Sequence, residues 1–198
     1  MAAFVDDVTL PNAKSWTYKM SGKRKNENFV GTKLIALDVD GGPNLSTVLE
    51  YLDVHNLTPN AHYFTFSDEP NKFRLLYLLD QELANEVVFT HIQKGLKILL
   101  DDVGCEVDNT FDAARLWYGG LRGDVESNEV KNTEKLFEIV NSKLVTKYNY
   151  TGVLKEMGLM TTQNEFIRPD LPELTGGNNI SSIVGSTEFG KNTAKRNP

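Results

Sequence analysis

The strongest constraint on the fold is a pair of apolar segments joined by a very short link. Residues His62 to Ser67 read HYFTFS and residues Phe73 to Leu79 read FRLLYLL, with only DEPNK between them. Both segments are rich in the aromatic and aliphatic residues typical of strands. A parallel crossover needs a dozen or more residues, so the short link predicts an antiparallel hairpin.

The other predicted elements place helices and further strands around this hairpin. In chain order, the elements are a strand over 33–39, a helix over 44–55, the hairpin strands over 62–67 and 73–79, a helix over 81–103, a strand over 113–119 and a helix over 129–148. Asn44 is a suitable N-cap, and Gly104 stands where a helix-ending glycine is common. The first six elements match the split βαββαβ arrangement, so we expect an α+β fold with an antiparallel sheet.

Composition divides the chain into three regions. Residues 1–28 are polar and are predicted to form an irregular N-terminal extension. Residues 29–160 hold the predicted elements and form the expected domain, which is long enough for one hydrophobic core. Large apolar side chains become rare from residue 161, so 161–198 is predicted to be a tail or linker.

Charge, apolar runs and cysteine content exclude several classes of protein. The formal net charge of -6 excludes a protein that coats DNA by bulk electrostatics, but it leaves a local basic groove possible. No apolar run approaches the roughly 20 residues that span a bilayer, and the first residues do not resemble a secretory signal. The single cysteine, Cys105, excludes an internal disulfide. We expect a cytoplasmic protein without a membrane partner.

Two aspartates end the predicted strand over 33–39. Asp38 and Asp40 alternate with Val39, so their side chains leave the same face of the strand, about 7 Å apart at Cα. Close carboxylates need a cation or hydrogen bonds to offset their repulsion, and their oxygens suit Mg²⁺ or Mn²⁺. Asp108 and Asp112 precede the last predicted strand and offer a third ligand. The pattern predicts a metal site for phosphate chemistry, although two solvated acids would look the same.

Basic residues elsewhere in the chain are expected beside this pair. The first and third strands of a βαββαβ sheet are neighbours, so Arg74 can lie near the carboxylates. Lys72 precedes it, and Arg115 opens the last predicted strand. The planar donor fork of arginine suits phosphate oxygens. The alternative is that Lys72 and Arg74 are surface cations near Glu69.

Three segments in series resemble the archaeo-eukaryotic primase superfamily, most closely the primase-polymerase domains of plasmid and phage replication proteins. The family's first motif is an apolar strand ending in D-h-D, here LIALDVD. Its second is a strand with T-x-S, a short loop and an F-R strand, here FTFSDEPNKFRLLYLLD. Its third is an acid followed by R-h-aromatic-G, here VDNTFDAARLWYGG. Order and approximate spacing agree across residues 33–120.

This resemblance implies an RRM-like catalytic core that performs nucleotidyl transfer in DNA replication with two Mg²⁺ or Mn²⁺ ions. The residues it assigns are the catalytic, metal-binding carboxylates Asp38, Asp40 and Asp108, and the nucleotide-binding residues Ser67, Lys72, Arg74 and Arg115. The implied partners are single-stranded DNA, nucleoside triphosphates and a replicative helicase. The family's second motif often reads S-x-H, whereas Ser67 is followed here by Asp68 and Glu69. An acid at that position would repel a triphosphate.

A haloacid-dehalogenase-like phosphatase is the rival enzyme class, because LIALDVDG also fits its D-x-D-G motif. Asp38 would then be the nucleophile and Asp40 the general acid/base. The supporting residues would come from Thr65, Ser67, Lys94, Lys97, Asp101 and Asp102. That fold has a parallel sheet, which the short hairpin link opposes.

A non-catalytic module that binds DNA or a replication partner is the remaining alternative. Trp16, Tyr18 and the basic run over 23–25 could stack on a single strand and neutralise it, although such a run is more often a solvated face. Trp117 and Tyr118 are expected to place one ring inward. His91 and Cys105 are predicted to be structural.

Overall fold

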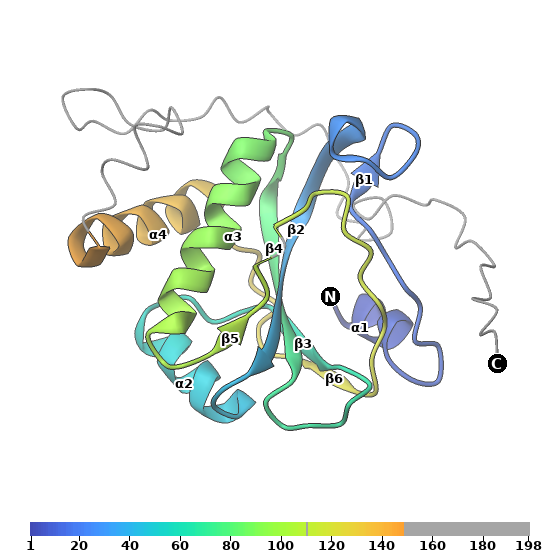
Figure 1. The fold of residues 1–198 in the computed structure, drawn as a ribbon, viewed down its shortest axis with the longest axis horizontal. Helices are drawn as coiled ribbons and strands as arrows, with labels where there is room; N and C mark the ends of the chain where they lie inside the picture. The colour runs from blue at the N-terminus through green and yellow to red at the C-terminus, as the bar shows by residue number, and fades with distance from the viewer. Residues whose placement is uncertain (110, 149–198) are drawn as a thin grey trace.

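The computed structural model describes residues 1–109 and 111–148, and the predicted tail over 161–198 lies outside them. A mixed sheet-and-helix architecture fills these ranges (Figure 1). The elements are α1 (Ala2–Val8), β1 (Lys19–Met20), the 3₁₀ helix η1 (Asn26–Asn28), β2 (Phe29–Gly41), α2 (Leu45–Val54), β3 (Ala61–Phe64), β4 (Phe73–Leu83), α3 (Glu86–Asp101), β5 (Glu106–Val107), β6 (Gly123–Val125) and α4 (Thr133–Tyr148). Within the described part of the chain, none of these helices is long and apolar enough to span a bilayer.

The sheet is built around its two longest strands, β2 and β4. β4 pairs with one edge of β2, and the sheet continues through β3 to β6. β1 pairs with β2 near its start, and β5 pairs with it near its end. All pairs between named strands are antiparallel in the described ranges. The predicted α+β class with an antiparallel sheet is confirmed, and this pairing contradicts the parallel sheet of a haloacid-dehalogenase-like phosphatase.

Helices cover one face of the sheet, and the N-terminal part of the chain covers the other. α2, α3 and α4 lie on one side of the sheet in Figure 1, and α1 lies on the opposite side. α2 packs against the core through Leu45, Val48 and Leu52, a spacing that places three side chains on one helical face. The site described below lies on the face opposite these three helices.

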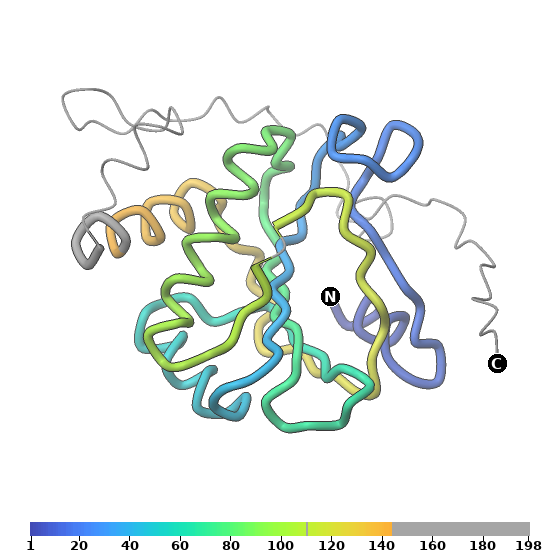
Figure 2. The backbone as a smooth tube through the Cα atoms, viewed as in Figure 1, coloured from blue at the N-terminus to red at the C-terminus, as the bar shows by residue number. Residues whose placement is uncertain are grey.

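The prediction that residues 1–28 are irregular is wrong for much of that segment. α1 buries three apolar side chains, and Trp16 and Tyr18 are only 3% and 1% exposed. The backbones of Trp16 and Trp117 exchange hydrogen bonds of 2.9 and 2.8 Å, and their rings stack with centroids 5.4 Å apart. Figure 2 shows the two segments side by side. Because both rings are buried, Trp16 and Tyr18 do not offer the stacking surface that the DNA-binding module requires.

The predicted strand over 113–119 is also wrong. The strand that follows α3 is β5, and residues 113–119 contribute only an isolated bridge between Trp117 and Trp16. Trp117 is 2% exposed and Tyr118 is 60% exposed, so one ring of the pair does face inward, as expected. The alternation reflects packing of Trp117 on the N-terminal segment and not pairing within the sheet.

The hairpin and the helix after Asn44 are confirmed. β3 and β4 pair antiparallel, and the Asn44 side chain accepts a first-turn backbone N–H at 3.1 Å. β4 continues to Leu83, where it still pairs with β2, so α3 begins at Glu86 and not at residue 81. Asn85 caps α3 by accepting two backbone N–H groups of its first turn. Residues 81–83, which helical spacing assigned to the helix, therefore belong to β4.

The residues predicted to be structural are buried. His91 on α3 is 0% exposed, and its Nε2 lies 2.5 Å from the side-chain oxygen of Asn141 on α4. Cys105 is 5% exposed. Gly104 has φ +84°, the left-handed conformation expected of a glycine just after a helix.

Candidate metal and phosphate site

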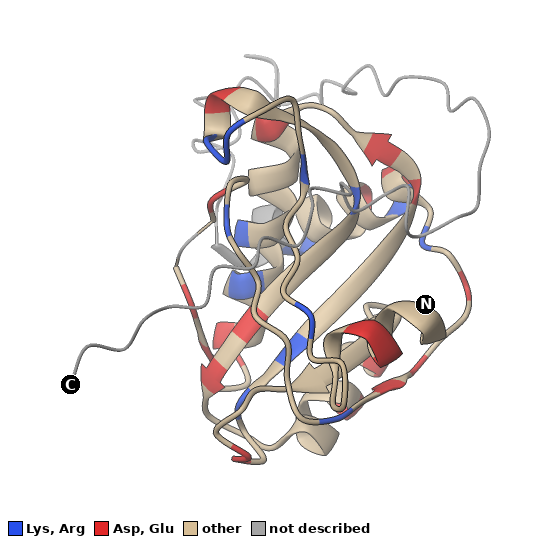
Figure 3. Cartoon of the chain, turned by 90° about the vertical axis from the view of Figure 1, so that its right-hand side faces the viewer, with Lys and Arg blue, Asp and Glu red and all other residues tan. Residues whose placement is uncertain are grey.

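Asp38 and Arg74 form a buried ion pair across the two central strands. Their positions are direct partners in the β2–β4 register, so both side chains leave the same face of the sheet. Arg74 Nε donates to Asp38 Oδ1 at 2.9 Å, and a terminal nitrogen of the same guanidinium donates to Oδ2 at 3.4 Å. In Figure 3, red acidic positions and a blue basic position lie on neighbouring strands of the sheet. The prediction that Arg74 lies beside the carboxylates is confirmed.

A network of polar and aromatic groups fixes the Arg74 guanidinium. Its Nη1 donates to the Tyr63 hydroxyl at 3.3 Å and makes a short hydrogen bond to the Tyr118 carbonyl oxygen. The Tyr63 hydroxyl also accepts from Trp16 Nε1 at 3.2 Å and donates to the Tyr118 carbonyl at 3.2 Å. The guanidinium lies over the Tyr63 ring, 5.3 Å from its centroid. Several partners from distant segments thus hold one cation against Asp38.

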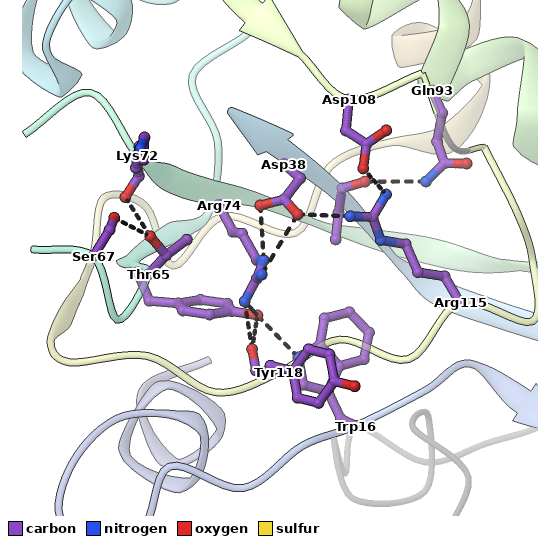
Figure 4. Close-up of polar contacts among 12 residues, drawn as sticks. Trp16, Asp38, Thr65, Ser67, Lys72, Arg74, Gln93, Asp108, Arg115 and Tyr118 are labelled. Carbon is purple, nitrogen blue, oxygen red and sulfur yellow. Dashed lines mark hydrogen bonds and ion pairs between the residues drawn. The ribbon is translucent and has the colours of Figure 1, made fainter. Parts of the chain in front are cut away.

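Arg115 links two aspartates from different segments (Figure 4). Its Nη2 donates to Asp38 Oδ2 at 2.7 Å, and its Nη1 lies 2.8 Å from Asp108 Oδ2. The guanidinium lies over the Trp117 ring, 4.6 Å from its centroid, where the ring face attracts a cation. Asp108 directly follows β5, and its backbone N–H donates to the Asp38 carbonyl at 3.0 Å. This hydrogen bond holds Asp108 beside Asp38.

The three predicted carboxylates come together. Asp38, Asp40 and Asp108 each offer one oxygen, and these oxygens lie within 4.8 Å of one another. We call this group the carboxylate triad. Asp38 is buried, Asp108 is half-buried and Asp40 is exposed at the end of β2. Burial and then the charges of Asp38 and Asp108 raise the pKa of Asp40, and the charges of Arg115 and Arg74 offset this only in part.

The donors of the triad fit a hard divalent cation. Mg²⁺ and Mn²⁺ prefer carboxylate oxygens as ligands. The triad offers three such oxygens within 4.8 Å of one another. Burial and the two neighbouring carboxylates raise the pKa of Asp40, and a bound cation would stabilise its ionised form.

Ser67 and Lys72 lie on the β3–β4 side of this group, away from Asp108 and Arg115 (Figure 4). The Ser67 hydroxyl is 2.9 Å from the Thr65 hydroxyl, and Lys72 Nζ donates to Glu69 at 2.7 Å. The hydrogen bond to Glu69 is the main cause that raises the pKa of Lys72, with Asp40 a smaller cause. These hydrogen bonds lie within the segment between β3 and β4, and the nucleotide-binding roles of Ser67 and Lys72 stay predictions.

Sequence reasoning missed several groups around the site. Tyr63 and the Tyr118 carbonyl hold Arg74, and Trp117 supports Arg115. Arg122 pairs with Asp68, so the acid that stands near the family's histidine position carries a local counter-charge. Alternation along β3 could have placed Tyr63 on the face of Arg74 once the strand register was known. A main-chain carbonyl such as that of Tyr118 has no signal in the sequence.

Comparisons with known proteins yield one structural neighbour to report. No protein-family model matches the chain, and no curated protein matches it in sequence. The solved AEP domain of the cyanophage S-2L primase-polymerase (PrimPol) is similar, with a TM-score of 0.49 and 12% identity over 71% of this chain and 77% of that chain. At this level of similarity, function has to be inferred from the residues of the site itself.

Proposed function

We propose that this chain is a metal-dependent nucleotidyltransferase of the primase-polymerase type, which joins nucleoside triphosphates on a single-stranded DNA template in replication. One observation carries the proposal. The three carboxylates assigned by the motif resemblance come from β2 and from the chain after β5, yet their oxygens converge within 4.8 Å beside two guanidinium groups. Carboxylates that hold cations next to arginines that bind phosphates are the parts that phosphoryl transfer requires.

The residues divide the work by charge. Asp40 and Asp108, with one oxygen of Asp38, would hold Mg²⁺ or Mn²⁺, which when bound lowers the pKa of an attacking hydroxyl and neutralises charge on phosphoryl oxygens. Arg115 would bind the triphosphate. Arg74 would hold the Asp38 carboxylate in a fixed orientation, because it contacts both carboxylate oxygens.

The finer fold assignment belongs to the same proposal. β5, β2, β4 and β3 lie side by side in an all-antiparallel order, with α2 and α3 joining them. This is the order of a split βαββαβ unit, and it supports an RRM-like core. Ser67 and Lys72 would contact the nucleotide from the neighbouring loop. The replicative helicase and the three-region division of the chain stay predictions.

The test is incorporation of labelled nucleotides on a single-stranded template with Mg²⁺ or Mn²⁺, with and without a primer. Asp40→Asn should abolish incorporation, because Asp40 is the exposed member of the triad and would be lost as a metal ligand. Asp124→Asn is the matched control, since Asp124 is an exposed aspartate on β6 outside the triad. Full incorporation by Asp40→Asn would refute the proposal. Template binding without incorporation by the wild type would favour the binding module.

A further inference from the structure

Arg115 stands between two carboxylates of the triad and contacts both of them. Its two terminal nitrogens lie 2.7 Å from Asp38 Oδ2 and 2.8 Å from Asp108 Oδ2. We propose that Arg115 is an exchangeable counter-cation, which neutralises the triad until a divalent metal displaces it and then binds a nucleotide phosphate. This inference rests on the proposed function and adds to it a coupling between the two ligands.

Arg74 does not have the same freedom. It contacts Asp38, the Tyr63 hydroxyl and the Tyr118 carbonyl, and it comes from the middle of the sheet on β4. Moving it would leave several buried polar groups without partners at once, each of which costs about 1–3 kcal/mol. Arg74 is therefore the permanent partner of Asp38.

Arg115 lies in a segment outside helices and strands, and its side chain is 17% exposed. Its backbone is anchored, because its N–H donates to the Asp112 carbonyl and its own carbonyl accepts from the Thr17 hydroxyl, both at 3.0 Å. An anchored backbone with a long side chain at the edge of the site allows the guanidinium to rotate away while the fold stays intact. Arginine also binds phosphate as readily as carboxylate, so it has a second partner of the same geometry.

The two oxygens of Asp38 have different partners, which suits this exchange. Arg74 Nε holds Oδ1 at 2.9 Å, whereas Oδ2 takes the shorter contact with Arg115 and only a 3.4 Å contact with Arg74. Departure of Arg115 would therefore release Oδ2 of Asp38 and Oδ2 of Asp108 together. These oxygens belong to two different triad members, and both would then be available to a divalent cation.

Metal and nucleotide binding should therefore favour each other. Metal binding without phosphate must draw Arg115 away from Asp38 and Asp108. Phosphate without metal must draw Arg115 away from two carboxylates. When both ligands are present, every charge has a partner. Such coupling is reciprocal, and typical values change an affinity about 5–150-fold.

The first experiment measures Mn²⁺ affinity by calorimetry in the absence of nucleotide. Arg115→Gln should bind Mn²⁺ about tenfold more tightly than the wild type, because the competing cation is gone. Arg115→Lys keeps the positive charge but lacks the two terminal nitrogens with which arginine contacts both carboxylates. Its Mn²⁺ affinity should therefore lie between those of the wild type and Arg115→Gln. Arg122→Gln is the matched control, since this arginine pairs with Asp68 outside the triad, and it should bind Mn²⁺ like the wild type. Circular dichroism verifies that each variant is folded.

The second experiment follows the displacement itself. The chain has two tryptophans, Trp16 and Trp117, which stack on each other below the Arg115 guanidinium. Mg²⁺ titration should change the tryptophan emission of the wild type as the guanidinium leaves the ring. The same titration should leave the emission of Arg115→Gln unchanged, although that variant binds the metal more tightly.

The outcomes separate this inference from the proposed function. Tighter Mn²⁺ binding by Arg115→Gln together with a lost emission change would support the exchange. Equal Mn²⁺ affinity of the wild type and Arg115→Gln would refute the exchange and leave the metal-dependent function standing. Absence of Mn²⁺ binding in the wild type and in every Arg115 variant would refute the proposed metal site itself.

Discussion

Asp38→Asn should destabilise the fold, even though Asp38 is a candidate catalytic residue. Asp38 is 6% exposed and is the shared anionic partner of Arg74 and Arg115, whose side chains are only 10% and 17% exposed. Removing one member of a buried ion pair costs about 3–5 kcal/mol, because the remaining charge stays buried without its partner. Asparagine keeps one acceptor oxygen, so we expect a loss of about 3 kcal/mol, near the lower end.

The assay is urea denaturation followed by far-UV circular dichroism, with thermal unfolding as a second measure. A loss of about 3 kcal/mol corresponds to a fall of roughly 6–12 °C in Tm for a chain of this size. Asp101→Asn is the matched control, because Asp101 pairs with Lys97 one helical turn away on α3 and is 43% exposed. Such an exposed helical pair contributes only about 0.3–0.5 kcal/mol.

A double mutant separates the ion pair from other effects. Adding Arg74→Gln to Asp38→Asn removes the buried cation that the first change leaves without its partner, so the two losses should not add. A free energy of unfolding for Asp38→Asn within about 0.5 kcal/mol of the wild type would refute the reasoning. It would mean that water or a rearranged side chain compensates both guanidinium groups.

The remaining predictions concern single residues around the site. The pKa of Asp40 is raised in the folded protein, so Asp40 stabilises the fold below its ordinary pKa of 3.8, and this stabilisation is lost as pH rises through the raised value. Asp40→Asn should therefore raise Tm at neutral pH by about 2 °C, and this gain should disappear in acid. Thermal unfolding across pH checks this, and a lower Tm at pH 7 would contradict it. Tyr63→Phe should lower the free energy of unfolding by about 1–2 kcal/mol, because the Tyr63 hydroxyl forms hydrogen bonds with Trp16, Arg74 and the Tyr118 carbonyl. An unchanged midpoint in urea denaturation would argue against that network. Gly42→Ala should cost more than about 2 kcal/mol by the same assay, since Gly42 has φ +99° and a Cβ there would meet the Gly104 carbonyl oxygen at 2.3 Å.

The different environments of Asp38 and Asp40 affect how the function is tested. Loss of activity in an Asp38 variant mixes loss of a metal ligand with loss of stability. Asp40 is exposed, and the neighbouring charges of Asp38 and Asp108 contribute to its raised pKa. Asp40→Asn therefore tests the chemistry without weakening the fold. Functional groups often lower the stability of a protein. Here Asp38 contributes to stability through its ion pairs, whereas Asp40 lowers stability at neutral pH.

The sequence alone determined those elements that depend on a pattern within a few neighbouring residues. The run LIALDVD predicts a buried strand, and the strand ends in aspartates whose side chains share one face because of the period of two. The five-residue link between the predicted strands over 62–67 and 73–79 leaves only an antiparallel hairpin, and β3 and β4 pair in this way. The predicted order of strands placed the first and third strands side by side, and Asp38 and Arg74 are indeed direct partners in the β2–β4 register.

Tertiary structure decided what depends on contacts between distant segments. The alternation of Trp117 and Tyr118 looks like a strand in sequence, but it arises because Trp117 packs on Trp16, about a hundred residues earlier in the chain. The bridge from Arg115 to Asp38 and Asp108 likewise requires that a loop be folded back over the sheet. Sequence determined which charges are available to this site. The packing of the N-terminal segment against the 113–119 segment brings Arg115 to Asp38 and Asp108, and such pairing between distant segments depends on the whole fold.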